Sequence, residues 1–296
     1  APARQTFVSD LVTEAELSNA VALNSTSFNG ARLIGPAAAG LLISWVGSGW
    51  VFVINAASFV AVIASLHLLR LAELQRHALA VRTRGSLLEG FRYVWNRPDL
   101  VAILSMLFLI ATFGLNFPIF VSMMSVTVFH GGPGQYGVLI STMAVGSVTG
   151  ALLSARRAQP RLAQLLVSAI AFSLSMLVAA LMPNAVLFGL VLIVVGMSAQ
   201  TFMTTSNSLV QLSTEPAMRG RVLAILLALA LGGTPLGAPI VGWVADAFGA
   251  RWSLGIGVVA GAAALLVGLR YLVRHRGLRI GFANGRLRIA IDQGRR

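Results

Sequence analysis

Side chains that could perform chemistry are few and widely separated in this chain. The 296 residues include no cysteine and only four histidines, which are isolated and lack the spacing of paired metal ligands. Within the long apolar segments there is no pair of carboxylates and no combination of serine, histidine and aspartate. Thiol chemistry, metal sites and hydrolytic catalysis all need such groupings. We therefore predict that the chain is not an enzyme, and we predict neither a metal nor a cofactor.

We single out five polar residues inside long apolar segments, where a polar group needs a partner or a cavity. An arginine in the hydrocarbon region of a bilayer costs about 2.5–3.5 kcal/mol even on lenient insertion scales. Arg32 should therefore face either a ligand or counter-ion in a cavity, or a carboxylate or carbonyl on another helix. The amides favour interhelical hydrogen bonds or a polar cavity wall. Asn116, two residues before Pro118, is the strongest candidate among the amides. The five residues are Arg32, Asn55, Asn116, Gln200 and Asn207.

The composition requires that most of this chain be solvated by lipid. Hydrophobic residues make up 57% of it, charged residues only 10%, and its mean hydropathy is +0.83. A soluble domain carries about 25% charged residues. Crossing a bilayer takes about 20 helical residues, and eight apolar segments are long enough. They lack the alternation of a membrane barrel, so we predict an all-α, polytopic membrane protein. The predicted spans are 20–46, 50–69, 100–129, 136–155, 162–182, 185–212, 221–245 and 252–273.

The arginines predict the orientation of these spans. The chain has 22 basic residues, all arginine, and a formal net charge of +13. They cluster in alternate connections, whereas the other connections hold only Arg251. The positive-inside rule then predicts that both chain ends of a multi-pass membrane protein lie in the cytoplasm. Short clusters between apolar runs indicate lipid headgroups as partners, not the continuous basic surface that binds nucleic acid.

A parallel repeat relates the first and seventh predicted spans. Four glycines and a tryptophan recur 202 positions later, and both spans are expected to start on the same side of the membrane. Parallel repeats of six-helix halves are one way of building large membrane proteins. On this pattern spans 3–8 form a complete half, and four further helices are expected before Ala1. The matching residues are Gly30, Gly35, Gly40, Gly47 and Trp50 with Gly232, Gly237, Gly242, Gly249 and Trp252.

The repeat divides the chain into four parts. Residues 1–70 hold the last two helices of the first half, residues 100–273 form the second half, and residues 274–296 form a basic, flexible cytoplasmic tail. Residues 71–99 are a cytoplasmic linker, in which Ser86 and Glu89 have the spacing of a capping box. They predict a short amphipathic helix ending before Pro98, although a simple extension of the next span is an alternative. In the tail, Asn284 and Gly285 have the composition of a hairpin turn.

Several segments together resemble the major facilitator superfamily. The similarity lies in residues 2–8, 29–40, 88–98, 219–222 and 232–239, and it extends over nearly the whole chain to about residue 273. The branch it resembles is the bacterial drug:proton antiporter type that includes enterobactin exporters and macrolide efflux proteins. Two departures are visible. The signature loop between helices 2 and 3 is absent, and Gly35, Pro36 and Gly40 match the helix 5 motif only in part.

The resemblance implies that the eight spans are helices 5–12 of a twelve-helix fold. It further implies a secondary transporter that exports amphipathic small molecules by alternating access, with protons as the coupling ion. The expected partners are the lipid bilayer, a small-molecule substrate and the missing helices 1–4. The alternative is a truncated, non-transporting membrane protein or scaffold. In the transporter reading, the five polar residues named above line the substrate pathway.

Two further groups of residues receive roles in this reading. The first comprises glycines and prolines within the spans, which serve as hinges or simply as sites of close packing and permanent kinks. These are Gly30, Gly35, Pro36, Gly40, Pro118, Pro235 and Pro239. The second comprises charged residues at the ends of spans, which contribute to gating or only fix topology. These are Arg219 and Arg221, with Glu215 or the linker as expected partners, together with Asp246 and Arg251.

Overall fold

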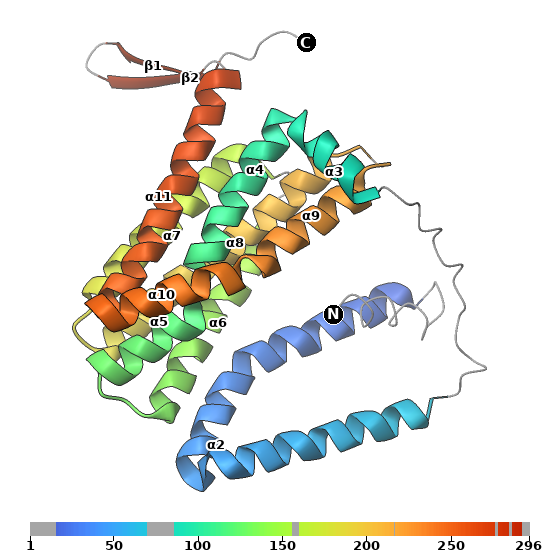
Figure 1. Ribbon diagram of the computed structural model, residues 1–296, viewed down its shortest axis with the longest axis vertical. Coiled ribbons are helices and arrows are strands. Elements are labelled where there is room, and N and C mark those ends of the chain that lie inside the picture. Colours follow the sequence, from blue (N-terminus) through green and yellow to red (C-terminus); the bar gives the residue numbers. More distant parts are fainter. Residues whose placement is uncertain are drawn as a thin grey trace. The chain divides into compact units, whose positions relative to one another are not determined.

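The computed structural model describes residues 16–69, 86–155, 160–215, 217–275, 278–283 and 286–291 (Figure 1). Within the first helix the surroundings of many residues are also left out, so the predictions for Arg32, Pro36 and Gly40 lie outside the described residues. The chain divides into two units, residues 1–84 with 131–141 and residues 85–130 with 142–296. Each unit is described by itself.

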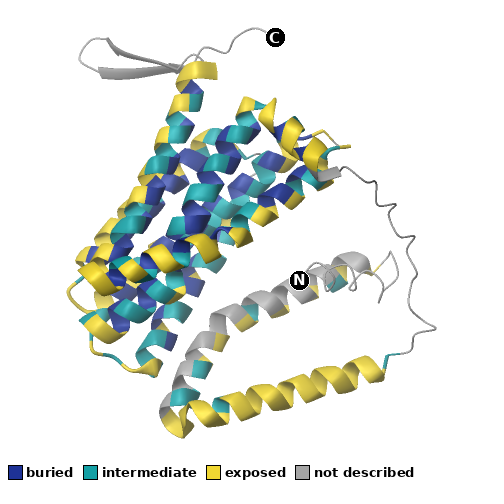
Figure 2. Cartoon of the chain, viewed as in Figure 1, coloured by how far each residue is buried: buried dark blue, intermediate teal, exposed yellow. Residues whose placement is uncertain are grey.

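The first unit consists mainly of one interrupted helix. Helix α2 runs from Leu17 to His67 and has non-helical backbone at Gly47, with φ 81° and ψ 163°. The break falls within the connection predicted at 46–49, so the first two predicted spans are confirmed as helices. The part after the break, Trp45–His67, is long and apolar enough to cross a membrane. Its side chains are exposed over almost its whole length, as the yellow ribbon of Figure 2 shows.

The second unit is a bundle of membrane-length helices. Including Trp45–His67, the described residues hold seven helices long and apolar enough to cross a membrane. The one remaining predicted span, 20–46, is the first part of α2. The elements of the bundle are α4 (Pro98–Leu109), η2 (Ile110–Gly114), α5 (Phe117–Met123), η3 (Met124–Val128), α6 (Pro133–Ala155), α7 (Leu162–Leu181), α8 (Ala185–Ser213), α9 (Arg219–Gly232), α10 (Thr234–Phe248) and α11 (Ala250–His275). The first residues of α6, up to Ser141, group with the first unit.

Local sequence explains where several of these helices begin and end. Helix α7 ends at Leu181, two residues before Pro183, because a residue that precedes proline disfavours helical backbone. Helix α8 then begins with an N-cap, in which the Asn184 side-chain oxygen accepts a hydrogen bond from the Leu187 amide at 2.9 Å. Helix α4 begins with Pro98 in its first turn, where the missing N–H is not needed.

The core of the bundle lies between α4, α7, α8 and α11, which share the most extensive contacts. Large side chains fill it, and Phe120, Phe172, Phe188 and Phe202 are fully buried. Many other apolar side chains, such as Leu181, Val259 and Leu266, are exposed on the outer faces (Figure 2). An apolar exterior around a packed core is what a bilayer solvent requires.

Glycines let α6 and α8 approach closely. A side chain at Gly146 would overlap the carbonyl of Ile193, and one at Gly196 would overlap the carbonyl of Met143. The backbones therefore meet without intervening side chains, as small residues permit in membrane helices.

Two segments outside the bundle complete the description. A short helix, α3 (Ser86–Trp95), is present where the linker helix was predicted, and residues 70–85 lie outside the described residues. Strands β1 (Leu278–Ala283) and β2 (Arg286–Ile291) pair antiparallel, with Ala283 opposite Arg286. The all-α class thus holds for the membrane-spanning part, and the predicted turn at Asn284 and Gly285 lies outside the described residues.

Candidate functional site

The first helix of the bundle is broken near the middle of its 31-residue span. After α4 the chain widens into the π-helical turn η2, in which the Leu115 amide donates to the Ile110 carbonyl at 3.0 Å. Leu115 and Asn116 leave helical geometry, and α5 begins with Pro118 in its first turn. Such a break frees main-chain carbonyls, which must find other partners at this depth in a membrane.

Asn116 supplies one of those partners. It is the N-cap residue of α5, yet its side chain makes no capping hydrogen bond. Its Nδ2 instead donates to the Thr112 carbonyl at 2.8 Å. Asn116 is 2% exposed and Thr112 is 1% exposed. The Asn116 Oδ1 and the Thr112 Oγ1 nevertheless find no hydrogen-bond partner among the residues that the structure describes. A buried polar atom left in this state costs about 1–3 kcal/mol, so this polar pair is available to bind something else.

A second discontinuity lies against the first. Helix α9 ends at Gly232 and α10 begins at Thr234, with Pro235 in its first turn. A side chain at Gly233 would overlap the Thr112 Oγ1, and one at Gly237 would overlap the Thr112 carbonyl. Glycine is therefore required here because backbone packs on backbone. Two interrupted helices thus meet at Thr112 and Asn116, and we name these residues with Gly233 and Gly237 the junction site.

Two other predicted pathway residues, Gln200 and Asn207, have hydrogen-bond partners on their own helix. On α8, the Gln200 Nε2 donates to the Thr204 Oγ1 at 3.3 Å, and Gln211 donates to Asn207. These residues follow one another at helical spacing and form a polar stripe along α8. No hydrogen bond joins this stripe to Asn116 within the described part of the chain. Asn55 is exposed on α2, in the other unit.

A charged cluster holds α3 against the end of the bundle where α8 finishes and α9 starts. The Arg221 Nη1 lies 3.0 Å from the Glu89 Oε2. Beside this ion pair Gly90 is buried, and a side chain there would come within 3.2 Å of the Arg221 Cβ and 3.3 Å of the Ile225 Cδ1. The linker was among the expected partners of Arg221, and the structure contains that contact. A gating role for it remains a prediction.

Arg97 joins the same helices through a second set of contacts. Its guanidinium donates to both carboxylate oxygens of Asp99, at 3.1 and 2.9 Å, and to the Ser213 carbonyl at 3.0 Å. The Tyr93 hydroxyl accepts from Arg97 and from the Glu215 amide, both at 3.3 Å. The hydrogen bond and charge of Asp99 raise the pKa of Arg97 above its ordinary value, although burial acts against them. This arginine therefore caps a main-chain carbonyl at the C-terminal end of α8.

The remaining predicted residues have simpler surroundings. Arg219 and Asp246 are exposed, and Arg251 donates to the Met182 carbonyl at 3.3 Å, which ties α11 to the end of α7. Pro239 lies inside α10. A side chain at Gly30 or Gly35 would meet no described atom within 4 Å, so close packing at these positions remains a prediction.

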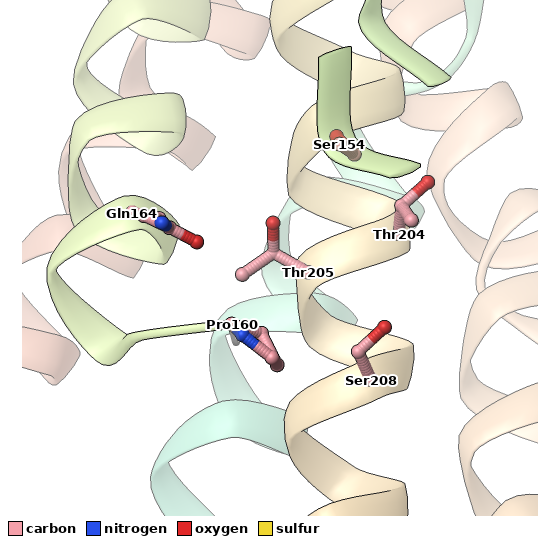
Figure 3. A pocket seen from close by; sticks show the side chains of 6 residues that line it. All are labelled: Ser154, Pro160, Gln164, Thr204, Thr205 and Ser208. Atoms are coloured by element: carbon pink, nitrogen blue, oxygen red, sulfur yellow. The ribbon is translucent and has the colours of Figure 1, made fainter. Parts of the chain in front are cut away.

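A small polar pocket opens between α6, α7 and α8 (Figure 3). Its volume is about 40 Å³, far below the ~300–1,000 Å³ of pockets that hold drug-sized molecules. It is therefore not a binding site for a transported amphipathic molecule. Sequence reasoning missed it because hydroxyl side chains in apolar helices carry no periodic signal. The lining residues are Ser154, Pro160, Gln164, Thr204, Thr205 and Ser208.

Comparison with known proteins identifies the family. A family model described as "transmembrane secretion effector" matches residues 1–278. The multidrug efflux pump Tap of Mycolicibacterium fortuitum is 28% identical over 256 residues, which are 83% of this chain and 62% of the pump. Tap of Mycobacterium tuberculosis (strain ATCC 25618 / H37Rv) is 29% identical over 228 residues, 75% of this chain and 54% of the pump. The staphyloferrin A transporter of Staphylococcus aureus is 23% identical over 257 residues, 84% of this chain and 62% of that protein.

A solved structure supports the same fold. The crystal structure of a bacterial homologue of the human lysosomal transporter Spinster, inward-facing and unoccupied, superposes with a TM-score of 0.62 at 16% identity. The match covers 92% of this chain and 75% of that one. The chain spans less than two thirds of the length of the curated relatives it matches. With membrane-length helices, the expected fold and a family match over almost its entire length, the chain belongs to the transmembrane secretion effector family of the major facilitator superfamily.

Proposed function

We propose that this chain is part of a secondary transporter that exports amphipathic small molecules by alternating access, in exchange for protons. The junction site is the observation that carries the proposal. Interrupted helices near the bilayer midplane are where transporters place substrate and ion sites. At the junction site two interruptions meet, and two buried polar atoms lack a partner within the described ranges of the chain. Relatives named as a multidrug efflux pump and as a staphyloferrin transporter favour export of small molecules.

Asn116 is the residue we assign to substrate contact in this mechanism. Its amide nitrogen donates to the Thr112 carbonyl, while its Oδ1, which has no partner among the described residues, can accept a hydrogen bond from a substrate when the helices part. Gln200 and Asn207 on α8, with Asn55 and Arg32 on α2, are proposed to line the same pathway. Pro118, Pro235 and Pro239 are proposed as bending points, together with Gly30, Gly35, Pro36 and Gly40.

Orientation and coupling complete the proposal. The arginine-rich connections place the α3 cluster on the cytoplasmic side of a bacterial plasma membrane, with both ends of the chain there. Arg219, Arg221, Asp246 and Arg251 then act at the membrane surfaces, in gating or in fixing topology. None of the nine acidic residues of the sequence lies deep in a predicted span. The proton-carrying carboxylate is therefore proposed to belong to four further helices that complete a twelve-helix fold.

The test is efflux of a fluorescent amphiphilic cation from vesicles under an imposed proton gradient. The protein is the longest in-frame product that contains this chain. We expect Asn116→Leu to lower the initial rate by about tenfold, the effect of losing roughly one hydrogen bond in the transition state. The control Asn96→Ala removes an exposed amide beside α3 and should leave the rate unchanged.

Each part of the proposal has its own contrary outcome. An unchanged rate in Asn116→Leu would remove the junction site from the pathway. Efflux that persists without a proton gradient would eliminate antiport. A protein that reaches the membrane in normal amount yet moves none of a panel of amphiphiles would favour the non-transporting scaffold.

A further inference from the structure

The pocket between α6, α7 and α8 is lined by side chains that can donate hydrogen bonds. The Gln164 Oε1 accepts from the Arg161 amide at 3.3 Å, and among the described residues no acceptor is found for its NH₂ group. The Thr204 Oγ1 accepts from Gln200, so its own hydroxyl proton is available. Hydroxyl and amide N–H groups without an acceptor are complementary to an oxyanion.

Thr205 is the buried donor at the centre of this pocket. It is 5% exposed, and no hydrogen bond to its hydroxyl is found within the described part of the chain. Figure 3 shows the hydroxyl pointing into the space between Gln164 and Ser154. A ligand that enters the pocket can therefore accept a hydrogen bond from this hydroxyl.

The start of α7 adds a favourable field. Pro160 and Gln164 line the pocket and flank the first turn of this 20-residue helix, whose N-cap is Arg161. Helix N-termini carry about half a positive charge and unpaired N–H groups, and they bind anions. None of the six lining residues is acidic, so no carboxylate opposes this field.

The dimensions of the pocket select the ligand. A water-sized group needs about 10–15 Å³ of cavity volume. A pocket of about 40 Å³ therefore holds roughly three such groups. That is enough for the oxygens of one phosphate group. Ser208 lies five residues before the end of α8, about 7.5 Å along the helix axis, so the pocket is near the end of a membrane-length helix. Phosphates of lipid headgroups are found at that level.

We propose that this pocket binds a single phosphate group, carried either by an anionic phospholipid of the adjoining leaflet or by a soluble phosphate ester. The Thr205 and Thr204 hydroxyls and the Gln164 amide donate to its oxygens, and the start of α7 stabilises its charge. The site is distinct from the junction site and does not depend on transport.

The test measures thermal stability of the purified chain in detergent as ligand is added. The probes are short-chain phosphatidylglycerol, glycerol 3-phosphate, inorganic phosphate and uncharged short-chain diacylglycerol. We expect phosphatidylglycerol to raise the melting temperature in a saturable way. Thr205→Val should weaken its apparent affinity by about tenfold, because one hydrogen bond to an anion is lost. The control Thr149→Val removes a hydroxyl of α6 that already donates to the Val145 carbonyl, and it should leave the affinity unchanged.

The soluble probes separate the two sources of phosphate. Stabilisation by glycerol 3-phosphate or inorganic phosphate, lost in Thr205→Val, assigns the site to soluble esters. Stabilisation by phosphatidylglycerol alone assigns it to lipid. Equal stabilisation by diacylglycerol, or no stabilisation by any phosphate, overturns the proposal.

A second variant keeps the test decisive if Thr205→Val does not fold. Gln164→Glu preserves the size of the side chain and places a negative charge in the pocket. We expect it to abolish the phosphate effect while the melting temperature without ligand stays near that of the parent. Binding of phosphatidylglycerol at the parental affinity would refute the site.

Discussion

Gly47 and Gly249 lie 202 positions apart in the sequence and have nearly the same backbone conformation, with φ 81° and ψ 163° at one and φ 98° and ψ 162° at the other. They are the described glycines with positive φ. Each joins two helices, and an exposed tryptophan, Trp50 or Trp252, follows three residues later. The glycine repeat seen in the sequence thus has a structural counterpart at the two turns that end the repeated segment.

Replacing either glycine by alanine should destabilise the protein by a similar amount. This combination of φ and ψ is adopted almost only by glycine, and a residue with a Cβ pays about 1–3 kcal/mol there. No described atom lies within 4 Å of the added methyl group, so the cost is backbone strain alone. Thermal unfolding in detergent measures it.

The controls for this prediction are Gly49→Ala and Gly255→Ala, which place the same methyl group in helical backbone with no described atom within 4 Å. They should be neutral or stabilising, because alanine is favoured over glycine in a helix by about 1 kcal/mol. Equal effects at all four positions would contradict the assignment of strain to the two turns.

The junction site gives a prediction with a control at a nearby glycine. Gly237→Ala places a methyl group onto the Thr112 carbonyl and should separate α10 from η2, with a loss of stability of about 1–3 kcal/mol or more. Gly232→Ala, five residues earlier, meets no described atom within 4 Å and should be tolerated. Chemical denaturation of the two variants measures the difference. If Gly237→Ala were as stable as Gly232→Ala, the close approach of the two interrupted helices would be wrong.

Hydropathy, arginine placement and glycine spacing were sufficient to predict the helices and the turn at Gly47, because these features follow from local composition. They also identified Asn116, since an amide beside a proline in an apolar span is conspicuous. They did not identify Thr112, because its contacts come from a π-turn and from glycines of a helix far along the chain, Gly233 and Gly237. Glu89 shows the same limit. Its spacing from Ser86 indicated a local cap, yet its carboxylate reaches Arg221 on a helix far along the chain.

Arg97→Lys should loosen the contact between α3, α4 and α8 although charge is conserved. One guanidinium bonds both oxygens of Asp99 and the Ser213 carbonyl, and a single ammonium group cannot reproduce that planar geometry. We expect faster amide exchange at the end of α8 in the variant. Unchanged exchange there would show that Arg97 holds only its neighbour Asp99.

The same contact should not depend on pH over the physiological range. The pKa of Arg97 is raised in the folded protein, so its stabilising effect is fully present below the unfolded-state pKa and is lost only as pH rises through the folded-state value. Both values lie far into the alkaline range. Amide exchange at the end of α8, corrected for intrinsic rates, should therefore be constant from about pH 6 to pH 9.

Reversing the ion pair between Glu89 and Arg221 tests whether charge or packing holds α3 to α9. The two side chains are 61% and 28% exposed, so the pair should contribute only about 0.2–1 kcal/mol. Glu89→Arg alone brings two like charges together and should increase amide exchange throughout α3, most strongly at low salt. Adding Arg221→Glu restores opposite charges and should recover most of the protection. If amide exchange in α3 were faster still in the double variant, the attachment of α3 would instead be assigned to Gly90 and Ile225. The reversal leaves the close contact of these two residues in place.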